Sequence, residues 1–397
     1  MAKRGAIDPE GDLRVSTHAV AELSSQALIS NFRAIREMAG GQSLVPMVKA
    51  NAYGHGAEWV LQTLRSETGI FGFGVATLEE GAAARQSLGV KGRKHPILVF
   101  SGTLPWTEEK GNYCEEHHLT PVIASEEDWR IFFKAGWPSR IAYQLKFNTG
   151  MNRLGIPVYY ASKIKKDLRE QPASWHPQGI FSHLAIGEQP QVALSRLQRE
   201  RFEHIRSELS GVLPSALFHL ANSSGIWNQK LWRLEGLTDL VRPGLSLYGI
   251  PPWAGAPLRG IHPVMTVRAP VVMIHTLKPG ESVGYGATYR VTGSAAEKIA
   301  ILGVGYGDGL HRTLSGASKG EGPGQGGWVS LGLRLEPVLG LVSMDLCAVR
   351  CGASVKVGDW AEIMGPSLDP WAQAQAAKTI PYELLTSVSS RVQRIYG

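Results

Sequence analysis

Cysteine is scarce in this sequence, with three residues in a chain of 397. Cys114, Cys347 and Cys351 are an odd set without C-x-x-C spacing, so the sequence indicates neither a disulfide framework nor a zinc site. Reduced thiols in a cytosol fit this usage best. We therefore expect a cytoplasmic protein without a bound metal.

Long apolar runs and concentrated charge are lacking as well. No run reaches the roughly 18 apolar residues that a membrane-spanning helix needs, and the opening M-A-K-R-G-A-I-D lacks the apolar segment of a secretory signal. The chain has 41 basic and 34 acidic residues, a net charge of +7, but its densest basic clusters, 91–94 and 163–169, are short. Because no basic stripe, arm or aromatic platform is present, we expect neither a membrane nor a nucleic-acid partner.

Strand-like and helix-like stretches alternate through the first two thirds of the chain. Helical patterns cover 27–38, 78–88, 126–135, 159–169 and 192–209. Between them lie eight short apolar runs, at 44–48, 73–77, 96–101, 121–125, 141–147, 179–184, 216–220 and 240–249. Eight alternations favour a closed (β/α)8 TIM-like barrel over an open doubly wound sheet. No G-x-G-x-x-G follows an early strand, which argues against a dinucleotide fold.

The texture of the sequence changes near residue 251. The stretch P-P-W-A-G-A-P at 251–257 is typical of a linker, and short strand-like runs with frequent turn residues follow it. We therefore predict three regions: a flexible lead at 1–14, a barrel at 15–261 and a smaller, mostly β domain at 262–397. The glycine-rich stretch 315–327 is expected to be a mobile loop of the second domain.

The stretch V-P-M-V-K-A-N-A-Y-G-H-G at 45–56 stands out in the barrel region. It places Lys49 at the carboxyl end of a buried strand, where an amine walled by apolar residues can lose its proton and attack an aldehyde to form a Schiff base. Tyr53 and the backbone of Gly54 and Gly56 could hold an anion beside it. A lone lysine after a strand is more often a solvated charge, so the interpretation depends on the whole string.

Other predicted strands also end in cations, amides and hydroxyls. In barrels of this type such ends meet on one face, and their convergence suits an anionic, phosphorylated cofactor. Taken singly, each histidine could be a satisfied core residue, and Ser223 could merely cap a helix. The residues are Lys146, Asn148 and Arg153 from the fifth run and the segment after it, His183 from the sixth, His219, Asn222 and Ser223 from the seventh and the segment after it, and Arg242 from the eighth.

Eight motifs in order extend this pattern over nearly the whole chain. They are K-A-N-A-Y-G-H-G, K-x-x-T-G-M-N-R-L-G, S-H-x-A, A-N-S-S, R-P-G-x-x-L-Y-G, G-Y-G-A-T-Y, G-Y-G-D-G and S-M-D. From about residue 15 to the C-terminus the chain resembles the alanine racemases. The resemblance implies a pyridoxal 5'-phosphate-binding barrel joined to a β domain, a small amino acid as substrate, and a homodimer whose active sites borrow residues from the partner subunit.

The resemblance also implies roles for individual residues. Lys49 would carry the cofactor and act as the base on the D side of Cα, and Tyr285 of the other subunit would be the opposite base. Lys146 is a position that family members often carry as a carbamate. Tyr53, Ser223, Gly244 and Leu245 would hold the phosphate, His183, Asn222, Arg242 and Tyr306 would contact the cofactor, and Arg153 and Met344 would contact the substrate.

These roles follow a coherent chemical logic. Racemisation needs an acid/base group on each face of a planar carbanion. The free pKa of tyrosine is about 10, and a nearby Arg153 or a charged His183 would favour the phenolate of Tyr285. If Arg242 donates to the pyridine nitrogen, its own pKa above about 12 keeps its proton, so the ring stays uncharged and transamination is suppressed.

Three positions depart from the family pattern. Asn148 replaces a usual aspartate beside Lys146 and Arg153, Leu341 stands where arginine is common, and Ser390 replaces a tyrosine that touches the phosphate. A smaller residue at 390 would enlarge the pocket and admit serine alongside alanine.

Two alternative functions remain open at this stage. A related pyridoxal-phosphate amino-acid decarboxylase would share the lysine but lack the G-Y-G-A-T-Y tyrosine. A non-catalytic pyridoxal-phosphate carrier would be a barrel alone.

Overall fold

The computed structural model describes residues 18–316 and 326–397, which divide into two units, one of 28–261 and one that joins residues up to 27 with 262–397. The expected flexible lead at 1–14 and most of the expected loop at 315–327 lie outside the described residues. Within the described residues, no helix is long and apolar enough to span a bilayer.

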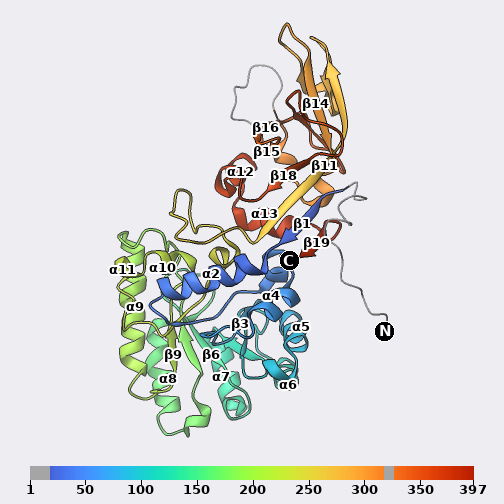
Figure 1. Cartoon of the computed structure of the whole chain (residues 1–397). Coiled ribbons are helices and arrows are strands. Elements are labelled where there is room, and N and C mark those ends of the chain that lie inside the picture. Colours follow the sequence, from blue (N-terminus) through green and yellow to red (C-terminus); the bar gives the residue numbers. More distant parts are fainter. Residues whose placement is uncertain (1–17, 317–325) are drawn as a thin grey trace, which may run out of the picture. The chain divides into compact units, whose positions relative to one another are not determined.

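The unit 28–261 is built on eight parallel strands that close into a barrel (Figure 1). In spatial order the strands are β2 (Ser43–Leu44), β10 (Leu240–Val241), β9 (Leu217–His219), β8 (Gly179–Phe181), β6 (Gln144–Asn148), β5 (Thr120–Ile123), β4 (Ile97–Val99) and β3 (Phe73–Val75). Parallel bridges from Leu44 to Ile70 and from Met47 to Gly74 join β2 to β3 and complete the circle. The predicted eight-stranded barrel is therefore confirmed.

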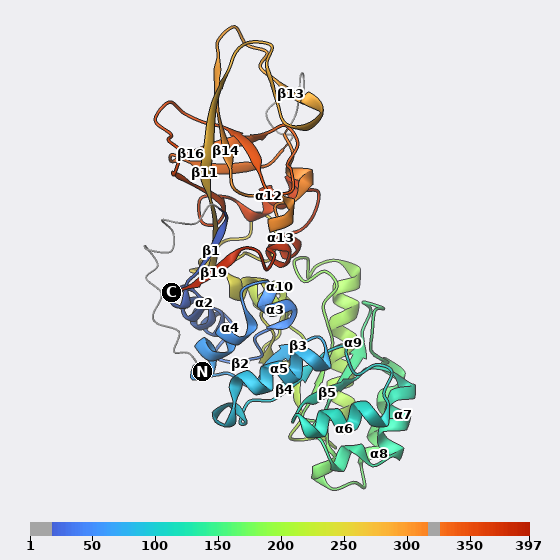
Figure 2. The same cartoon turned by 90° about the vertical axis from the view of Figure 1, so that its right-hand side faces the viewer.

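Helices surround the barrel strands, and those from α6 to α9 are seen on its outside in Figure 2. Most strands read as uninterrupted buried runs, because a parallel barrel is covered on both faces. Thr107 and Ser125 begin their helices as N-caps, accepting hydrogen bonds from the amides of Lys110 and Asp128. The helices are α3 (Lys49–Tyr53), α4 (Ala57–Leu64), α5 (Leu78–Leu88), α6 (Glu108–Glu116), α7 (Glu126–Lys134), α8 (Ala161–Leu168), α9 (Ala193–Leu209), α10 (Ser223–Trp227) and α11 (Gln229–Trp232), with α2 (Ser25–Met38) crossing the unit boundary and a short strand β7 (Ile156–Pro157) pairing with β6.

The second unit is mostly β, as predicted. Its main sheet runs in the order β14 (Glu297–Leu302), β17 (Cys347–Arg350), β16 (Arg334–Leu339), β15 (Trp328–Leu331), β18 (Trp360–Met364), β11 (Met265–Leu277), β1 (Val20–Leu23) and β19 (Gln393–Tyr396). The long strand β11 also pairs with β14, so six of these strands close on themselves. A hairpin of β12 (Ser282–Val283) and β13 (Tyr289–Arg290) and the helices α12 (Pro370–Ala376) and α13 (Pro381–Ser387) complete the unit.

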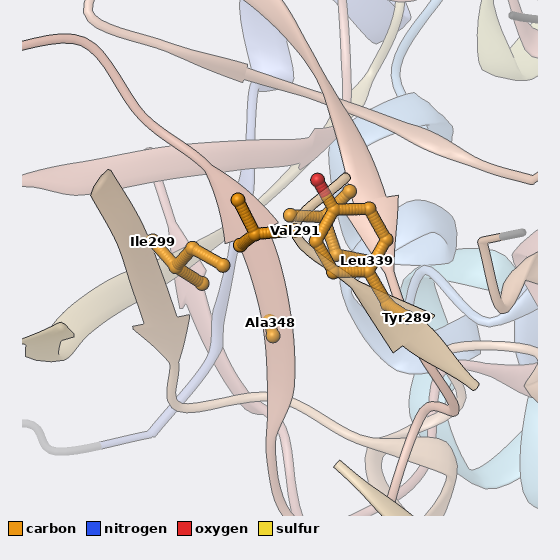
Figure 3. Packing of buried hydrophobic residues seen from close by; sticks show 5 residues of the cluster. All are labelled: Tyr289, Val291, Ile299, Leu339 and Ala348. Carbon is orange, nitrogen blue, oxygen red and sulfur yellow. The ribbon is translucent and has the colours of Figure 1, made fainter. Parts of the chain in front are cut away.

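Buried apolar side chains from several strands pack inside this β unit (Figure 3). The cluster consists of Tyr289, Val291, Ile299, Leu339 and Ala348. Tyr289 ends the G-Y-G-A-T-Y motif, so the segment that carries Tyr285 is anchored to this core by its last residue.

The first strand differs from the prediction, which assigned residues from 15 onward to the barrel. Strand β1 pairs antiparallel with β11, with Val20 opposite Arg268, and parallel with β19, with Val20 opposite Gln393. It therefore belongs to the sheet of the β unit. The sequence of a short strand does not show which distant segment will pair with it. Because this strand directly precedes the barrel in the sequence, it was assigned to the barrel.

Candidate active site

Lys49 follows the buried run 45–48 at the carboxyl end of strand β2, and an unusual turn comes after it. Ala50, Asn51, Ala52 and Tyr53 have φ between 50° and 55°, so four consecutive non-glycine residues are left-handed. This conformation costs about 1–2 kcal/mol per residue for an L-amino acid. Gly54 ends the turn, and its amide donates to the Ala50 carbonyl at 3.0 Å. Strain of this kind is typical of functional sites.

The environment of Lys49 favours the neutral amine. Burial, and then the charge of Arg153, lower the pKa of Lys49, while Glu80 raises it. Burial, together with Arg153, Arg242 and Lys49, lowers the pKa of Lys146 to about 8. These four cations lie close enough to influence one another, and the structure therefore brings together Lys49, Lys146, Arg153 and Arg242 as the sequence predicted. A site of this charge attracts anions.

His183 belongs to the same cluster, but it is not a cation. Burial first, and then the charges of Arg242, Arg153, Lys146 and Lys49, lower the pKa of His183 well below its usual range. The imidazole is neutral at neutral pH, so the prediction that a charged His183 would favour a phenolate is wrong. The sequence shows that a histidine follows the strand, but it does not show how many cations surround it.

Arg242 lies at the end of β10 in a buried chain of hydrogen bonds. Its Nη1 donates to His219 Nδ1 at 2.6 Å, and its Nη2 donates to the carbonyls of Ser182 and Leu220 at 2.6 and 3.2 Å. Since His219 Nδ1 accepts, its Nε2 carries the proton and donates to Gln144 Oε1 at 3.0 Å. Three of the five guanidinium N–H groups are thus used, which leaves Nε–H and one Nη1–H for another acceptor.

Burial lowers the pKa of Arg242 to about 9, below the value above 12 that we expected. The guanidinium still keeps its proton at neutral pH. Burial and the charge of Arg242 also lower the pKa of His219 well below its usual range, so this histidine is neutral. Its role is to accept a hydrogen bond from Arg242 and so hold the guanidinium in place.

Tyr53, Ser223 and Gly244 lie close to one another. Ser223 Oγ accepts from the amides of Gly244 and Ser246 at 3.1 and 3.4 Å. A Cβ at Gly244 would lie 2.6 Å from the Tyr53 hydroxyl oxygen, so only glycine allows that hydroxyl to lie this close to the backbone. The Ser246 hydroxyl is buried and has no hydrogen-bond partner among the described residues. Hydroxyls gathered beside backbone amides in this way are groups that can bind an anion such as a phosphate.

Two amides near the site have structural roles. Asn222 is the N-cap of α10, and its side chain accepts from the Gly225 amide at 3.0 Å. Asn148 Oδ1 accepts from the amides of Gly150 and Asn152 at 3.1 and 3.0 Å, so this side chain holds the turn before Arg153. The aspartate that is usual at 148 could accept the same two bonds, which explains why asparagine is tolerated here.

Sequence reasoning missed two residues that support this site. Gln144 is buried at the start of β6 and accepts a hydrogen bond from His219 Nε2. Tyr248 is buried beneath the turn, where its ring lies 5.0 Å from that of Tyr53 and its hydroxyl donates to the Met47 carbonyl at 2.7 Å. Tyr248 is the tyrosine of the R-P-G-x-x-L-Y-G motif, which was a signal available in the sequence.

The β unit carries the remaining predicted residues, Tyr285, Tyr306 and Met344, and their side chains are 72%, 43% and 52% exposed. Tyr306 and Met344 lie together, because the Tyr306 amide donates to the Ser343 carbonyl and the Gly307 amide donates to the Met344 carbonyl, at 3.0 and 2.9 Å. In the same unit, Arg391 forms ion pairs with Asp345 at 2.8 Å and with Asp308 at 3.4 Å. These ion pairs connect the segment that carries Met344 to the segment that carries Tyr306.

Two of the three positions that depart from the family pattern also lie in this unit. Leu341 is half-buried and its backbone lies beside Gly284, the residue before Tyr285. Ser390 is exposed and precedes Arg391. Among the described residues, no group of three or more histidines, cysteines or acids is placed to hold a metal ion.

Comparison with known proteins covers both units of the chain. Residues 23–252 match the family model for the alanine racemase N-terminal domain, and residues 264–396 match that for the C-terminal domain. The alanine racemase of Deinococcus radiodurans is 36% identical over 96% of this chain and 99% of its own length, and that of Nitrosococcus oceani is 34% identical over 94% and 97%.

Solved structures agree with these sequence matches. Alanine racemase from Streptomyces coelicolor A3(2) superposes with a TM-score of 0.83 at 28% identity, covering 98% of this chain and 99% of that one. The alanine racemase of Bartonella henselae, solved with covalently bound pyridoxal phosphate, gives a TM-score of 0.81 at 26% identity, covering 96% and 100%. On these matches, the chain belongs to the alanine racemase family.

Proposed function

We propose that this protein interconverts L-alanine and D-alanine by a two-base proton transfer at Cα that uses pyridoxal 5'-phosphate. The observation that carries the proposal is the cluster of Lys49, Lys146, Arg153 and Arg242, in which burial and mutual charge lower the pKa of the nucleophilic amine. A buried amine with a lowered pKa among fixed cations suits an anionic aldehyde.

The residues of the barrel fit the cofactor. The Tyr53 hydroxyl lies close to Gly244, and together with Ser223 and the backbone of Gly244 and Leu245 it would bind the phosphate. The two remaining N–H donors of Arg242 suit an acceptor such as the pyridine nitrogen. When bound, the cofactor supplies the electron sink that makes the Cα proton of the amino acid acidic.

The chain's own groups then move the proton. Lys49, which burial makes easier to deprotonate, takes or returns the proton on one face of Cα. Tyr285 does the same on the opposite face, and Arg153 orients the substrate carboxylate. Tyr306 and Met344 line the substrate side. Arg242 keeps its own proton at neutral pH, so it donates a hydrogen bond without protonating the ring nitrogen.

We further propose a homodimer in which Tyr285, Tyr306 and Met344 serve the site of the partner subunit. Their exposure supports this arrangement, since a tyrosine that is 72% exposed has no pocket of its own. A catalytic phenol in open solvent would also be hydrated and poorly oriented, and covering it would correct both.

Lys146 has the properties of a carbamylation site. Only a neutral amine attacks CO2, and a pKa of about 8 leaves an appreciable neutral fraction near neutral pH. In that step the nitrogen of Lys146 forms a bond to the carbon of CO2 and releases a proton. The resulting anion would neutralise part of the cation cluster. Protein prepared with isotopically labelled bicarbonate should give a carbamate signal that Lys146→Met removes.

Relaxed specificity is the finer part of the proposal. Ser390 is small and exposed where the family has a tyrosine, so we propose that serine is racemised alongside alanine. A panel of L-amino acids tests this idea, and turnover of alanine alone would end it. Ser390→Tyr should reduce serine turnover more than alanine turnover.

The alternatives have less support. A decarboxylase of the same architecture would lack the G-Y-G-A-T-Y tyrosine, which is present here. A carrier would be a barrel alone, whereas residues 264–396 match the racemase C-terminal domain. The three cysteines are free and buried, in keeping with a cytoplasmic location.

Purification offers a direct test of the activity. We expect a yellow protein that abolishes the optical rotation of L-alanine and of D-alanine alike. Release of CO2 from the amino acid would instead identify a decarboxylase, and a yellow protein without turnover would identify a carrier.

A further inference from the structure

The carboxylate of Glu80 joins two loops at the carboxyl end of the barrel strands. Glu80 lies in the first turn of α5, where Thr77 Oγ1 accepts from its amide at 3.2 Å. Its Oε2 accepts from the amides of Ala76 and Thr77 at 2.7 and 3.3 Å, which closes a capping box. Its Oε1 accepts from the amide of Ala50 at 2.7 Å. The helix has no need of this last bond, because Ala50 belongs to another loop.

Ala50 is where such a bond has the most effect. It is the first of the four left-handed residues, and it directly follows Lys49. A left-handed turn without glycine is held only when its surroundings fix it. A hydrogen bond to an ionised carboxylate is about twice as strong as one between neutral groups. Glu80 therefore fixes the backbone at the point where the direction of the Lys49 side chain is set.

Glu80 is also the source of negative charge beside Lys49. Arg153 lowers the pKa of Lys49 and Glu80 raises it. Lys146 and the neutral His183 face the same amine, since the charge of Lys49 affects both of them. Among the described residues, Glu80 is the one carboxylate that contributes to the pKa shift of Lys49, and no carboxylate contributes to those of Lys146 and His183.

We propose that Glu80 is a positioning residue for Lys49, whose carboxylate holds the left-handed turn and tempers the positive charge around the amine. The catalytic consequence rests on the proposed function, whereas the effect on the turn and on the amine does not. The simpler alternative is that Glu80 only caps α5.

Glu79 provides a matched control for the experiment. It occupies the same first turn of α5 and is exposed, whereas the Ala50 amide donates to Glu80. The full-length chain, before cofactor is added, is labelled competitively at its amines over a range of pH, and mass spectrometry follows Lys49. We expect Lys49 of Glu80→Gln to become reactive at lower pH than in the wild type, because a charge that raises its pKa is gone. Glu79→Gln should follow the wild-type profile.

Turnover gives the second measurement. Glu80→Gln keeps one acceptor oxygen but turns an amide N–H2 towards backbone donors, so the turn loosens. We expect kcat with L-alanine to fall about tenfold to a hundredfold, as for a displaced catalytic group, with a smaller change in KM. Glu79→Gln should retain the wild-type kcat.

A glycine separates the two effects of Glu80. Ala50→Gly keeps the amide but adopts the left-handed conformation without steric cost. Combined with Glu80→Gln, it should restore part of the melting temperature and of kcat, while the labelling profile of Lys49 stays at lower pH. If Glu80→Gln and Glu79→Gln behave alike in labelling and kcat, Glu80 is only a cap and the proposal is overturned. If the wild type racemises nothing but the labelling difference persists, the proposed function fails and the positioning role stands.

Discussion

The two units present their candidate residues in opposite ways. In the barrel unit, Lys146 and Arg242 are 6% and 3% exposed and are fixed by burial and hydrogen bonds. In the β unit, Tyr285 is 72% exposed and Met344 is 52% exposed. A buried cluster of cations is fully formed when its own unit folds, whereas exposed aromatic and sulfur-containing side chains mark a surface that another surface will cover. One half of the proposed chemistry is therefore formed within the barrel, and the residues of the other half lie exposed on the β unit.

The largest expected effect comes from the buried half. Lys49→Ala removes the amine that we propose both holds the cofactor and serves as one of the two bases. We expect turnover to fall by about four orders of magnitude or more, together with loss of the visible absorbance of the bound cofactor. Racemisation assays and spectra check both. Lys166→Ala, at an exposed lysine of helix α8, should change neither.

The exposed half should fail in a different manner. Tyr285→Phe removes a single hydroxyl and leaves the barrel untouched, so the cofactor should bind with its normal spectrum while turnover falls about 10²-fold to 10⁴-fold. Exchange of the Cα proton from one enantiomer should survive better than racemisation, because Lys49 remains. Undiminished turnover would contradict the two-base assignment.

Mixing the two inactive proteins tests whether each active site is shared between two subunits. If each site takes Lys49 from one subunit and Tyr285 from the other, a dimer of Lys49→Ala with Tyr285→Phe contains one intact site. After random exchange of subunits in equal amounts, we expect activity to return to about a quarter of the wild-type level, as for a twofold-symmetric dimer. Activity that stays at the background level after verified exchange would show that the sites are not shared.

The sequence predicted which residues lie at the carboxyl ends of the barrel strands better than it predicted their charge states. The eight buried runs overlap the eight observed strands, although the last, 240–249, continued past the end of β10 at Val241. Lys49, Lys146, His183 and Arg242 were found because a polar residue in or after a buried run is conspicuous. The charge state of His183 was predicted wrongly, since it depends on four cations from three parts of the barrel, of which β6 and the turn after it supply Lys146 and Arg153.

Features that depend on distant pairing were not visible in the sequence. Strand β1 pairs with β11 and β19, which lie more than two hundred residues further along the chain. The left-handed turn after Lys49 contains four residues, 50–53, that precede any glycine, so composition gave no sign of it. The bond from Ala50 to Glu80 likewise becomes evident only when two loops are seen together.

The smallest expected effect concerns stability and tests the buried cations directly. The pKa of Lys146 falls from 10.5 to about 8 on folding, so between these values the unfolded chain binds more protons than the folded one. The free energy of unfolding therefore rises with pH in this window. The lowered pKa of Lys146 reduces the free energy of unfolding by about 3 kcal/mol at a pH of about 7 and by about 2 kcal/mol at a pH of about 9.

Lys146→Met should remove this cost. Denaturant unfolding of cofactor-free protein, in buffer purged of CO2, should show the variant to be more stable than the wild type at neutral pH, with an advantage that narrows as the pH rises. The exposed Lys166→Met should give a pH-independent difference near zero. An advantage that did not narrow would mean that Lys146 binds its proton equally in the folded and the unfolded chain, so folding would not lower its pKa and the buried cluster would not hold a strained cation there.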